Sequence, residues 1–231
     1  MKKRFAAFVS TVLAAVLCAC SAAPKDVLPN KAAQPTEAPT QQAQTTQAAP
    51  TEQPTPEPDL VQQLLEEMTL EQKVGQLFLV RPDSLDLSQT QDQINDAKAD
   101  GVTELTDAMR QTLAEYPVGG VVIFGKNLES PQQITQFLDD LQQASDTPLF
   151  TAIDEEGGLV ARLANNAAFD LPQYESAAAV GTSGNPEDAR AMGRTIGGYL
   201  KEYGFNLDFA PVADVNTNPD NPVIGTRAFS S

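Results

Sequence analysis

The sequence predicts an α/β fold in which parallel strands alternate with helices, and three observations support this prediction. Short apolar segments of strand length recur between residues 76 and 212. Amphipathic segments of helix length separate them, and several begin with a Thr, Ser or Asn that suits a helix cap. Most of the apolar segments also end in polar or charged residues. Alternation of this kind is typical of parallel βα units.

Four strands are expected where apolar residues run together, at residues 76–80, 118–124, 149–153 and 205–212. The third has the most informative exit. Between Pro148 and Arg162 an apolar run ends in three carboxylates, two glycines and an arginine. Ligands meet side chains at the carboxyl ends of parallel strands. We therefore expect a binding site at this exit.

Capping residues mark the expected helix starts. Thr69 with Gln72 predicts a capping box, Ser130 precedes a proline at the first helical position, and Asn185 precedes a proline and two acidic residues. Gly204 suits the end of the last helix. The faces expected to be buried repeat at helical spacing: Leu60, Val61, Leu64, Leu65 and Met68; Leu105, Ala108, Met109, Leu113 and Tyr116; Ile134, Phe137, Leu138 and Leu141; and Ala189, Met192, Ile196 and Tyr203.

A doubly wound sheet and a barrel both fit this alternation. No GxGxxG follows the first strand and no Walker glycine-lysine loop occurs, which argues against nucleotide binding. Polar exits on several strands favour a barrel, because the loops that follow its strands face one pocket. A complete barrel takes about 250 residues. We therefore predict a (β/α)8 TIM-type barrel of which only about the first four βα units are present, so that the chain is truncated at Ser231.

The N-terminal 59 residues are expected to lie outside this domain. A basic head and an apolar run lead into Leu17-Cys18-Ala19-Cys20, which resembles a bacterial lipobox. Residues 1–19 are then a lipoprotein signal peptide, and Cys20 carries the lipid that anchors the protein to the extracytoplasmic face of the cell membrane. An ordinary cleaved secretory signal is the alternative. Residues 20–59, rich in Pro, Thr, Gln and Ala, are expected to form a disordered linker.

Composition excludes some functions. The net charge of −16 argues against binding to nucleic acid or to an anionic surface. Acidic residues spread over polar faces, including residues 83–107, are expected to serve solubility. No Cys/His cluster indicates a metal site. The absence of tryptophan counts against a module that binds sugars by stacking.

Five motifs occur in order at residues 68–77, 119–124, 154–162, 209–215 and 221–229. Together they resemble the N-terminal domain of family 3 glycoside hydrolases, in the β-N-acetylhexosaminidase branch, over residues 60–231. The resemblance implies retaining hydrolysis of terminal β-N-acetylglucosaminyl residues from peptidoglycan or chitin fragments. It implies an amino-sugar oligosaccharide or muropeptide substrate and no cofactor. The alternatives are another family 3 activity, such as that of a β-glucosidase, and a non-catalytic sugar-binding lipoprotein.

The resemblance also implies which residues contact the sugar. Asp154 would hold its hydroxyls, with Arg162 in the same subsite and Arg227 reaching it from the loop after the fourth strand. Structural pairing with neighbouring carboxylates is the alternative for both arginines. Glu155 and Glu156 are expected to be structural.

No catalytic residue is expected within the chain. The family's aspartate nucleophile and its histidine–aspartate acid/base pair would lie beyond Ser231. The absence of histidine from the sequence is therefore no argument against the chemistry, although residues 1–231 alone are expected to be inactive. Asp208 and Asp214, at the exit of the fourth strand, are weaker candidates and could simply brace a neighbouring loop.

Overall fold

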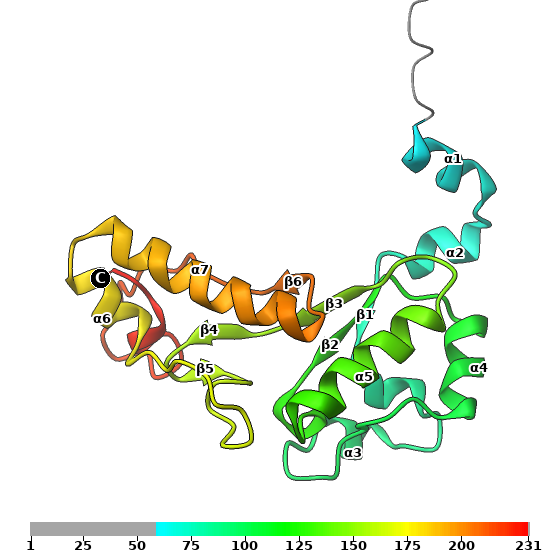
Figure 1. Cartoon of the computed structure of the whole chain (residues 1–231), viewed down its shortest axis with the longest axis horizontal. Helices are drawn as coiled ribbons and strands as arrows, with labels where there is room; N and C mark the ends of the chain where they lie inside the picture. Colours follow the sequence, from blue (N-terminus) through cyan, green and yellow to red (C-terminus); the bar gives the residue numbers. More distant parts are fainter. Residues whose placement is uncertain (1–58, 231) are drawn as a thin grey trace, which may run out of the picture. The chain divides into compact units, whose positions relative to one another are not determined.

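The computed structural model describes residues 59–230 (Figure 1). The predicted signal peptide, Cys20 and nearly all of the predicted linker lie outside the described residues. No helix within residues 59–230 is long and apolar enough to cross a membrane. In chain order the elements are α1 (Leu60–Glu67), α2 (Leu70–Gly75), β1 (Leu79–Val80), η1 (Pro82–Leu85), α3 (Gln91–Asn95), α4 (Asp107–Glu115), β2 (Gly120–Ile123), η2 (Gly125–Asn127), α5 (Pro131–Gln143), β3 (Phe150–Ile153), β4 (Glu155–Gly157), β5 (Val160–Ala161), α6 (Ala177–Thr182), α7 (Pro186–Tyr203), β6 (Leu207–Asp208) and η3 (Gly225–Arg227).

The main sheet settles which α/β architecture the chain adopts. Its strands lie in the order β1-β2-β3-β6, and every neighbouring pair is parallel. The strands thus follow one another in space as they do in sequence, as in the wall of a barrel, whereas a doubly wound sheet reverses direction at a switch point. The predicted partial (β/α)8 barrel is confirmed. Among the described strands, β1 and β6 each pair on one side only.

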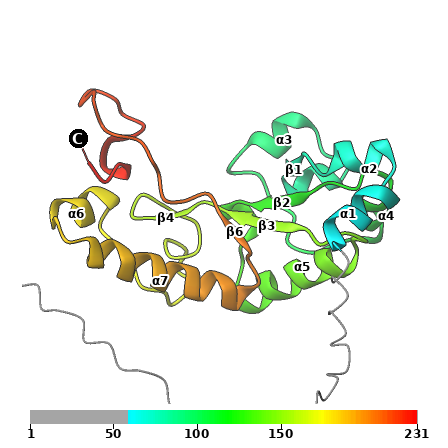
Figure 2. The ribbon, with the colours of Figure 1, turned by 90° about the horizontal axis from the view of Figure 1, so that it is seen from above.

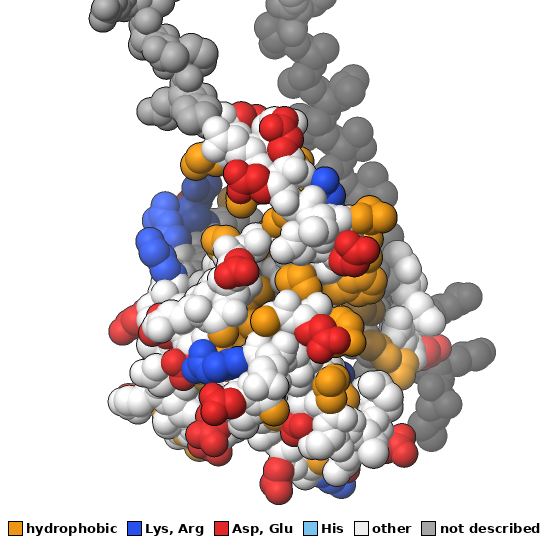
Figure 3. All heavy atoms as spheres, turned by 90° about the vertical axis from the view of Figure 1, so that its right-hand side faces the viewer, with side chains coloured by type: hydrophobic (Ala, Val, Ile, Leu, Met, Phe, Trp, Pro, Cys, Tyr) orange, Lys and Arg blue, Asp and Glu red, His pale blue; other side chains and the backbone are white. Residues whose placement is uncertain are grey.

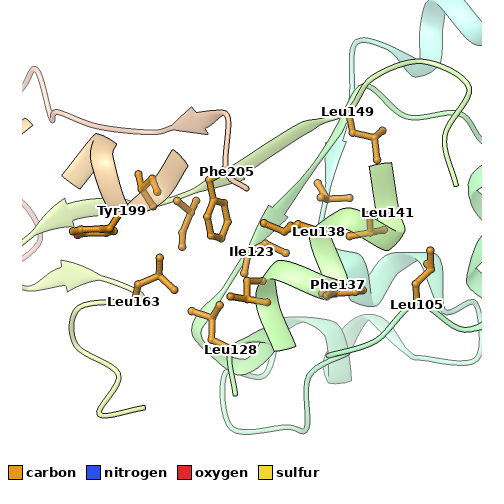
Figure 4. Close-up of a cluster of buried hydrophobic side chains, with 14 of the residues drawn as sticks. Leu105, Ile123, Leu128, Phe137, Leu138, Leu141, Leu149, Leu163, Tyr199 and Phe205 are labelled. Carbon is orange, nitrogen blue, oxygen red and sulfur yellow. The ribbon is translucent and has the colours of Figure 1, made fainter. Parts of the chain in front are cut away.

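The hydrophobic core lies between this sheet and the helices that cover it. In Figure 2, α5 and α7 lie on the same side of the strands, and they contact each other. The predicted stripe of α5 is fully buried, with Ile134, Phe137, Leu138 and Leu141 at most 1% exposed. Figure 4 shows Phe137, Leu138 and Leu141 in one cluster with Ile123 of β2, and Tyr199 and Phe205 belong to the same cluster.

The local signals that start and end the helices are confirmed. Thr69 and Gln72 form the expected capping box, and the Ser130 and Asn185 side chains accept backbone hydrogen bonds at the starts of α5 and α7. Gly204 ends α7 in the left-handed region, with φ of 95°. These signals work because each supplies a partner, or a backbone conformation, that a helix end requires.

Two predicted strands are much shorter than expected. Within residues 76–80 only Leu79 and Val80 are strand, because the amides of Leu77 and Phe78 donate to carbonyls of α2 and continue its turn. Within residues 205–212 only Leu207 and Asp208 are strand. An antiparallel pair, β4 and β5, follows β3 directly and was not predicted. Gly157 and Gly158 permit it because their φ angles are 84° and 73°, which other residues rarely adopt.

The predicted buried face of the first helix is wrong for the part of the chain described. Helix α1 forms, but none of its residues is buried, and Leu60 and Val61 are 68% and 66% exposed. Tyr116, expected in the stripe of α4, is also exposed. Figure 3 shows hydrophobic side chains at the surface on this side of the molecule. Periodicity marked the apolar face correctly, but it could not say what would cover that face.

Candidate functional site

Three side chains follow three neighbouring strands at the same edge of the sheet. Arg81 comes directly after β1, Phe124 after β2 and Asp154 after β3. The strands are parallel and in register, with Ile123 opposite Ile153. Because the carboxyl ends of parallel strands meet at one edge, these side chains belong to one site. The sequence singled out Asp154 but missed Arg81, although both follow a strand immediately.

The β4–β5 hairpin returns the chain to Asp154 and adds Arg162 to the site. The Arg162 Nη2 donates to the Asp154 Oδ2 at 3.0 Å, with side chains 33% and 27% exposed. The Asp154 Oδ1 has no hydrogen-bond partner among residues 59–230. The pair thus offers a free carboxylate acceptor beside guanidinium donors. Such a pair can bind neighbouring sugar hydroxyls.

The buried side chain of Glu155 holds this hairpin in place. Its side chain is fully buried and accepts from the amides of Leu163 and Ala164 at 2.9 and 3.0 Å and from the Tyr199 hydroxyl at 2.8 Å. Burial, followed by the nearby Glu155 charge, raises the pKa of Tyr199, so Tyr199 stays protonated as the donor. Glu155 thereby ties the residue after Arg162 to α7. The structural role expected for Glu155 agrees with these contacts.

Arg227, predicted to reach the sugar, contacts the same hairpin. Its guanidinium pairs there with Glu156. The Nε and Nη2 of Arg227 donate to the two Glu156 oxygens at 2.8 and 2.7 Å. These hydrogen bonds raise the pKa of Arg227, and the charges of Glu156, Asp154 and Asp214 act in the same direction. The structure thus places the Arg227 fork on Glu156, two residues after Asp154 in the chain. A ligand contact by Arg227 stays a prediction.

Asp208 holds the backbone of the site next to Asp154. Its Oδ1 accepts from the Glu155 amide at 3.0 Å. Burial raises the pKa of Asp208 to about 6, against the opposing effect of that hydrogen bond, and the charges of Glu155, Asp154 and Glu156 add to the rise. Asp214 is exposed, and no hydrogen bond or ion pair joins it to the other site residues described. Asp208 therefore braces the strand exit.

Metal ligands are not grouped at this edge. Within residues 59–230, no three His, Cys, Asp or Glu side chains are placed so that they could hold a metal ion. The carboxylates of the site instead accept hydrogen bonds from arginines, backbone amides and a tyrosine, and the Oδ1 of Asp154 has no such partner among the described residues. What the arrangement offers is hydrogen bonding to a polar ligand.

The sheet and its strand exits define the class of protein as a partial β/α barrel, with a partly exposed carboxylate–arginine pair where the loops after the strands meet. Residues 69–231 match the family model described as "Glycosyl hydrolase family 3 N terminal domain". The chain belongs to this family. The resemblance seen in the motifs is confirmed.

Relatives support the same branch. The chain is 37% identical over 134 residues to "Beta-hexosaminidase A" of Pseudoalteromonas piscicida, which is 56% of this chain and 22% of that protein. It is 34% identical over 131 residues to "Beta-hexosaminidase" of Thiobacillus denitrificans, covering 55% of this chain and 36% of that one. A solved family 3 β-N-acetylglucosaminidase from Paenibacillus matches 70% of this chain and 27% of its own, with a TM-score of 0.57 and 34% identity. The matched region therefore spans well under half the length of these relatives.

Proposed function

We propose that this chain is the sugar-holding part of a β-N-acetylhexosaminidase. The enzyme would release terminal non-reducing β-N-acetylglucosaminyl residues from peptidoglycan or chitin fragments. One observation carries the proposal: in a chain of this family, Asp154 and Arg162 pair at the strand exits and keep a free carboxylate oxygen. The names of the matched relatives, hexosaminidases and a β-N-acetylglucosaminidase, support the choice of sugar.

The chemistry would follow the two-step route of retaining glycosidases. A carboxylate attacks the anomeric carbon and expels the leaving group with the help of an acid, and water then releases the sugar. We assign Asp154 to binding and not to attack, because Arg162 occupies one of its oxygens and the other is free to accept a hydroxyl. The nucleophile and acid/base group are expected in residues beyond Ser231.

Attachment to the membrane is a second part of the proposal. The lipobox-like Leu17-Cys18-Ala19-Cys20 supports lipidation of Cys20 and an extracytoplasmic location. Metabolic labelling with a radioactive fatty acid tests this directly. The wild-type protein should carry label and Cys20→Ser should not, whereas label on neither would favour an ordinary secretory signal.

The activity is tested on the full-length gene product with nitrophenyl glycosides. We expect hydrolysis of the N-acetyl-β-glucosaminide, with β-configured product, and little hydrolysis of the β-glucoside. Preference for the glucoside would move the protein to another family 3 activity. No hydrolysis of either, together with measurable binding of N-acetylglucosamine, would support the non-catalytic sugar-binding alternative.

A further inference from the structure

The two arginines that contact the β4–β5 hairpin are held to different degrees by hydrogen bonds. Arg227 gives Glu156 two hydrogen bonds, which fix the plane of its guanidinium. Arg162 gives Asp154 only one, at 3.0 Å. The Nε of Arg162 is buried and has no hydrogen-bond partner among the described residues. Hydrogen bonds alone therefore leave the guanidinium of Arg162 free to turn away from Asp154, and another contact is needed to hold it.

The Phe124 ring supplies a contact of this kind. Phe124 follows β2 directly, and the guanidinium carbon of Arg162 lies over its ring, 5.5 Å from the ring centre. The negative face of an aromatic ring attracts a cation at this distance. A planar guanidinium also packs well against a planar ring. The ring is thus the second group, beside Asp154, that restrains the Arg162 side chain.

Arg81 lies against the same ring. It follows β1 directly, and its guanidinium carbon lies 4.2 Å from the centre of the Phe124 ring. Within residues 59–230 no carboxylate oxygen lies within 4.0 Å of Arg81. Its Nη1 donates instead to the Ile94 carbonyl at 2.6 Å, with a longer contact of 3.4 Å to the Asn95 side chain. The ring attracts both guanidinium groups, which offsets the repulsion between their like charges.

Residues 83–107, the acidic segment, hold the backbone of Phe124 as well. The Asn127 side chain accepts a hydrogen bond from the Phe124 amide at 3.0 Å. Its Nδ2 donates in turn to the Oδ2 of the fully buried Asp83 at 3.0 Å. Asp83 belongs to the acidic segment, as does Ile94, whose carbonyl holds the arginine on the ring. The segment therefore fixes both the backbone of Phe124 and the group that packs on its side chain.

We infer that Phe124 and Arg81 are positioning residues for the sugar-binding pair: the ring holds the Arg162 guanidinium toward Asp154, and Arg81 holds the ring. The inference rests on the proposed function and adds to it a role for the acidic segment, whose buried carboxylate and Ile94 carbonyl set the two positioning residues. Neither Phe124 nor Arg81 has to touch the sugar for this role. Changes at either residue should therefore alter the affinity for the sugar and leave the chemical step nearly unchanged.

NMR of the arginine Nε–H groups in the isotope-labelled, full-length protein tests the contact itself. The ring current of Phe124 should shift the Nε–H signal of Arg162, which is assigned by its absence from Arg162→Lys. Phe124→Leu should return the signal to the position of an exposed arginine, and Phe124→Tyr, which keeps the ring, should leave it in place. This measurement requires neither sugar binding nor hydrolysis. A signal that Phe124→Leu does not move would overturn the inference.

Kinetics on the nitrophenyl N-acetyl-β-glucosaminide test the effect on the sugar site. Phe124→Leu should raise KM about tenfold and keep kcat within about twofold, because the lost cation–π contact acts on binding. Arg81→Gln should raise KM about threefold, and Phe124→Tyr should stay near the wild-type value. The matched control is Phe78→Leu, which removes an exposed ring at the opposite end of β1 and should leave KM unchanged.

A double-mutant cycle separates positioning from a general loss of structure. If Phe124 acts through Arg162, Phe124→Leu should lower kcat/KM by less than about twofold in an Arg162→Gln background, where its target is absent. The full tenfold loss in both backgrounds, or a loss that falls on kcat, would overturn the inference. A wild-type protein that neither binds N-acetylglucosamine nor hydrolyses the glycoside would overturn the proposed function instead, and the NMR result would still decide whether the ring holds Arg162.

Discussion

Two arginine–carboxylate pairs lie at the β4–β5 hairpin. They differ in the number of hydrogen bonds that join them and in how exposed their side chains are. Arg162 gives Asp154 one hydrogen bond, with both side chains roughly a third exposed. Arg227 gives Glu156 two hydrogen bonds, and the Glu156 side chain is only 6% exposed. The first pair keeps a carboxylate oxygen for a ligand, whereas the second uses both oxygens of its carboxylate. Exposure and the number of hydrogen bonds, more than residue type, therefore distinguish the open pair, which we propose binds the sugar, from the closed pair.

Removing the open pair's carboxylate should have the largest effect on activity. Asp154→Asn in the full-length protein should lower kcat/KM for the N-acetyl-β-glucosaminide about 100-fold, because a charge-assisted hydrogen bond to the sugar is lost. The melting temperature should change little, since an ion pair about a third exposed adds little stability. A loss of activity under about threefold would remove Asp154 from the binding site.

Removing the closed pair's carboxylate should reverse that pattern. Glu156→Gln leaves Arg227 partly buried without its carboxylate, so the free energy of unfolding should fall by about 2 kcal/mol. Urea denaturation of the variant measures this, and Asp154→Asn is the matched control on the same hairpin. A larger loss of activity than of stability in Glu156→Gln, relative to that control, would show that Arg227 and Glu156 serve the ligand after all.

Asp208 accepts a hydrogen bond from the Glu155 amide, between the carboxylates of the two pairs. The pH dependence of stability tests its pKa. Its pKa of about 6 lies above the ordinary value of 3.8, so the folded protein takes up a proton there more readily than the unfolded chain. Its contribution to stability is therefore greatest below about pH 4 and is lost as pH rises through about 6.

Asp208→Asn removes this dependence. The unfolding free energy of the variant, minus that of the wild type, should rise by about 1 kcal/mol between pH 4 and pH 6.5, after allowance for solvent screening. Urea titrations at several pH values provide the measurement. A difference that stays flat across this range would show that Asp208 has an ordinary pKa.

The smallest effect is expected for Tyr199, which donates a hydrogen bond to Glu155 next to the open pair. Tyr199→Phe removes one hydrogen bond to the buried Glu155 and should lower the free energy of unfolding by about 1 kcal/mol. Because Glu155 holds the amide after Arg162, KM should rise slightly, by about twofold, with kcat unchanged. Unchanged stability would mean that Glu155 holds the hairpin through backbone amides alone.

The sequence predicted what local chemistry controls. Caps at Thr69, Ser130 and Asn185, and the buried stripe of α5, are present because each depends on residues a few positions apart. Polar strand exits favoured a barrel over a doubly wound sheet, and parallel pairing of the strands in sequence order agrees with that prediction. The family was recognised from motifs that lie in order, and the family model confirms it.

What the sequence could not predict depends on distant contacts. The closure of Arg227 on Glu156 joins residues 71 positions apart, and pattern alone left this pairing open beside a ligand role. The stacking of Arg81 on Phe124 joins the exits of two separate strands. The apolar faces of α1 and of residues 76–78 were read correctly as apolar, but their burial depends on partners outside the pattern.

A crystal structure of the full-length protein with N-acetylglucosamine bound is the most direct test of the account. We predict that the sugar hydroxyls accept from Arg162 and donate to the free oxygen of Asp154, while Glu156 keeps both hydrogen bonds from Arg227. A sugar bound elsewhere, or one bound with Asp154 beyond hydrogen-bond distance, would contradict the assignment of the open pair as the sugar-binding site.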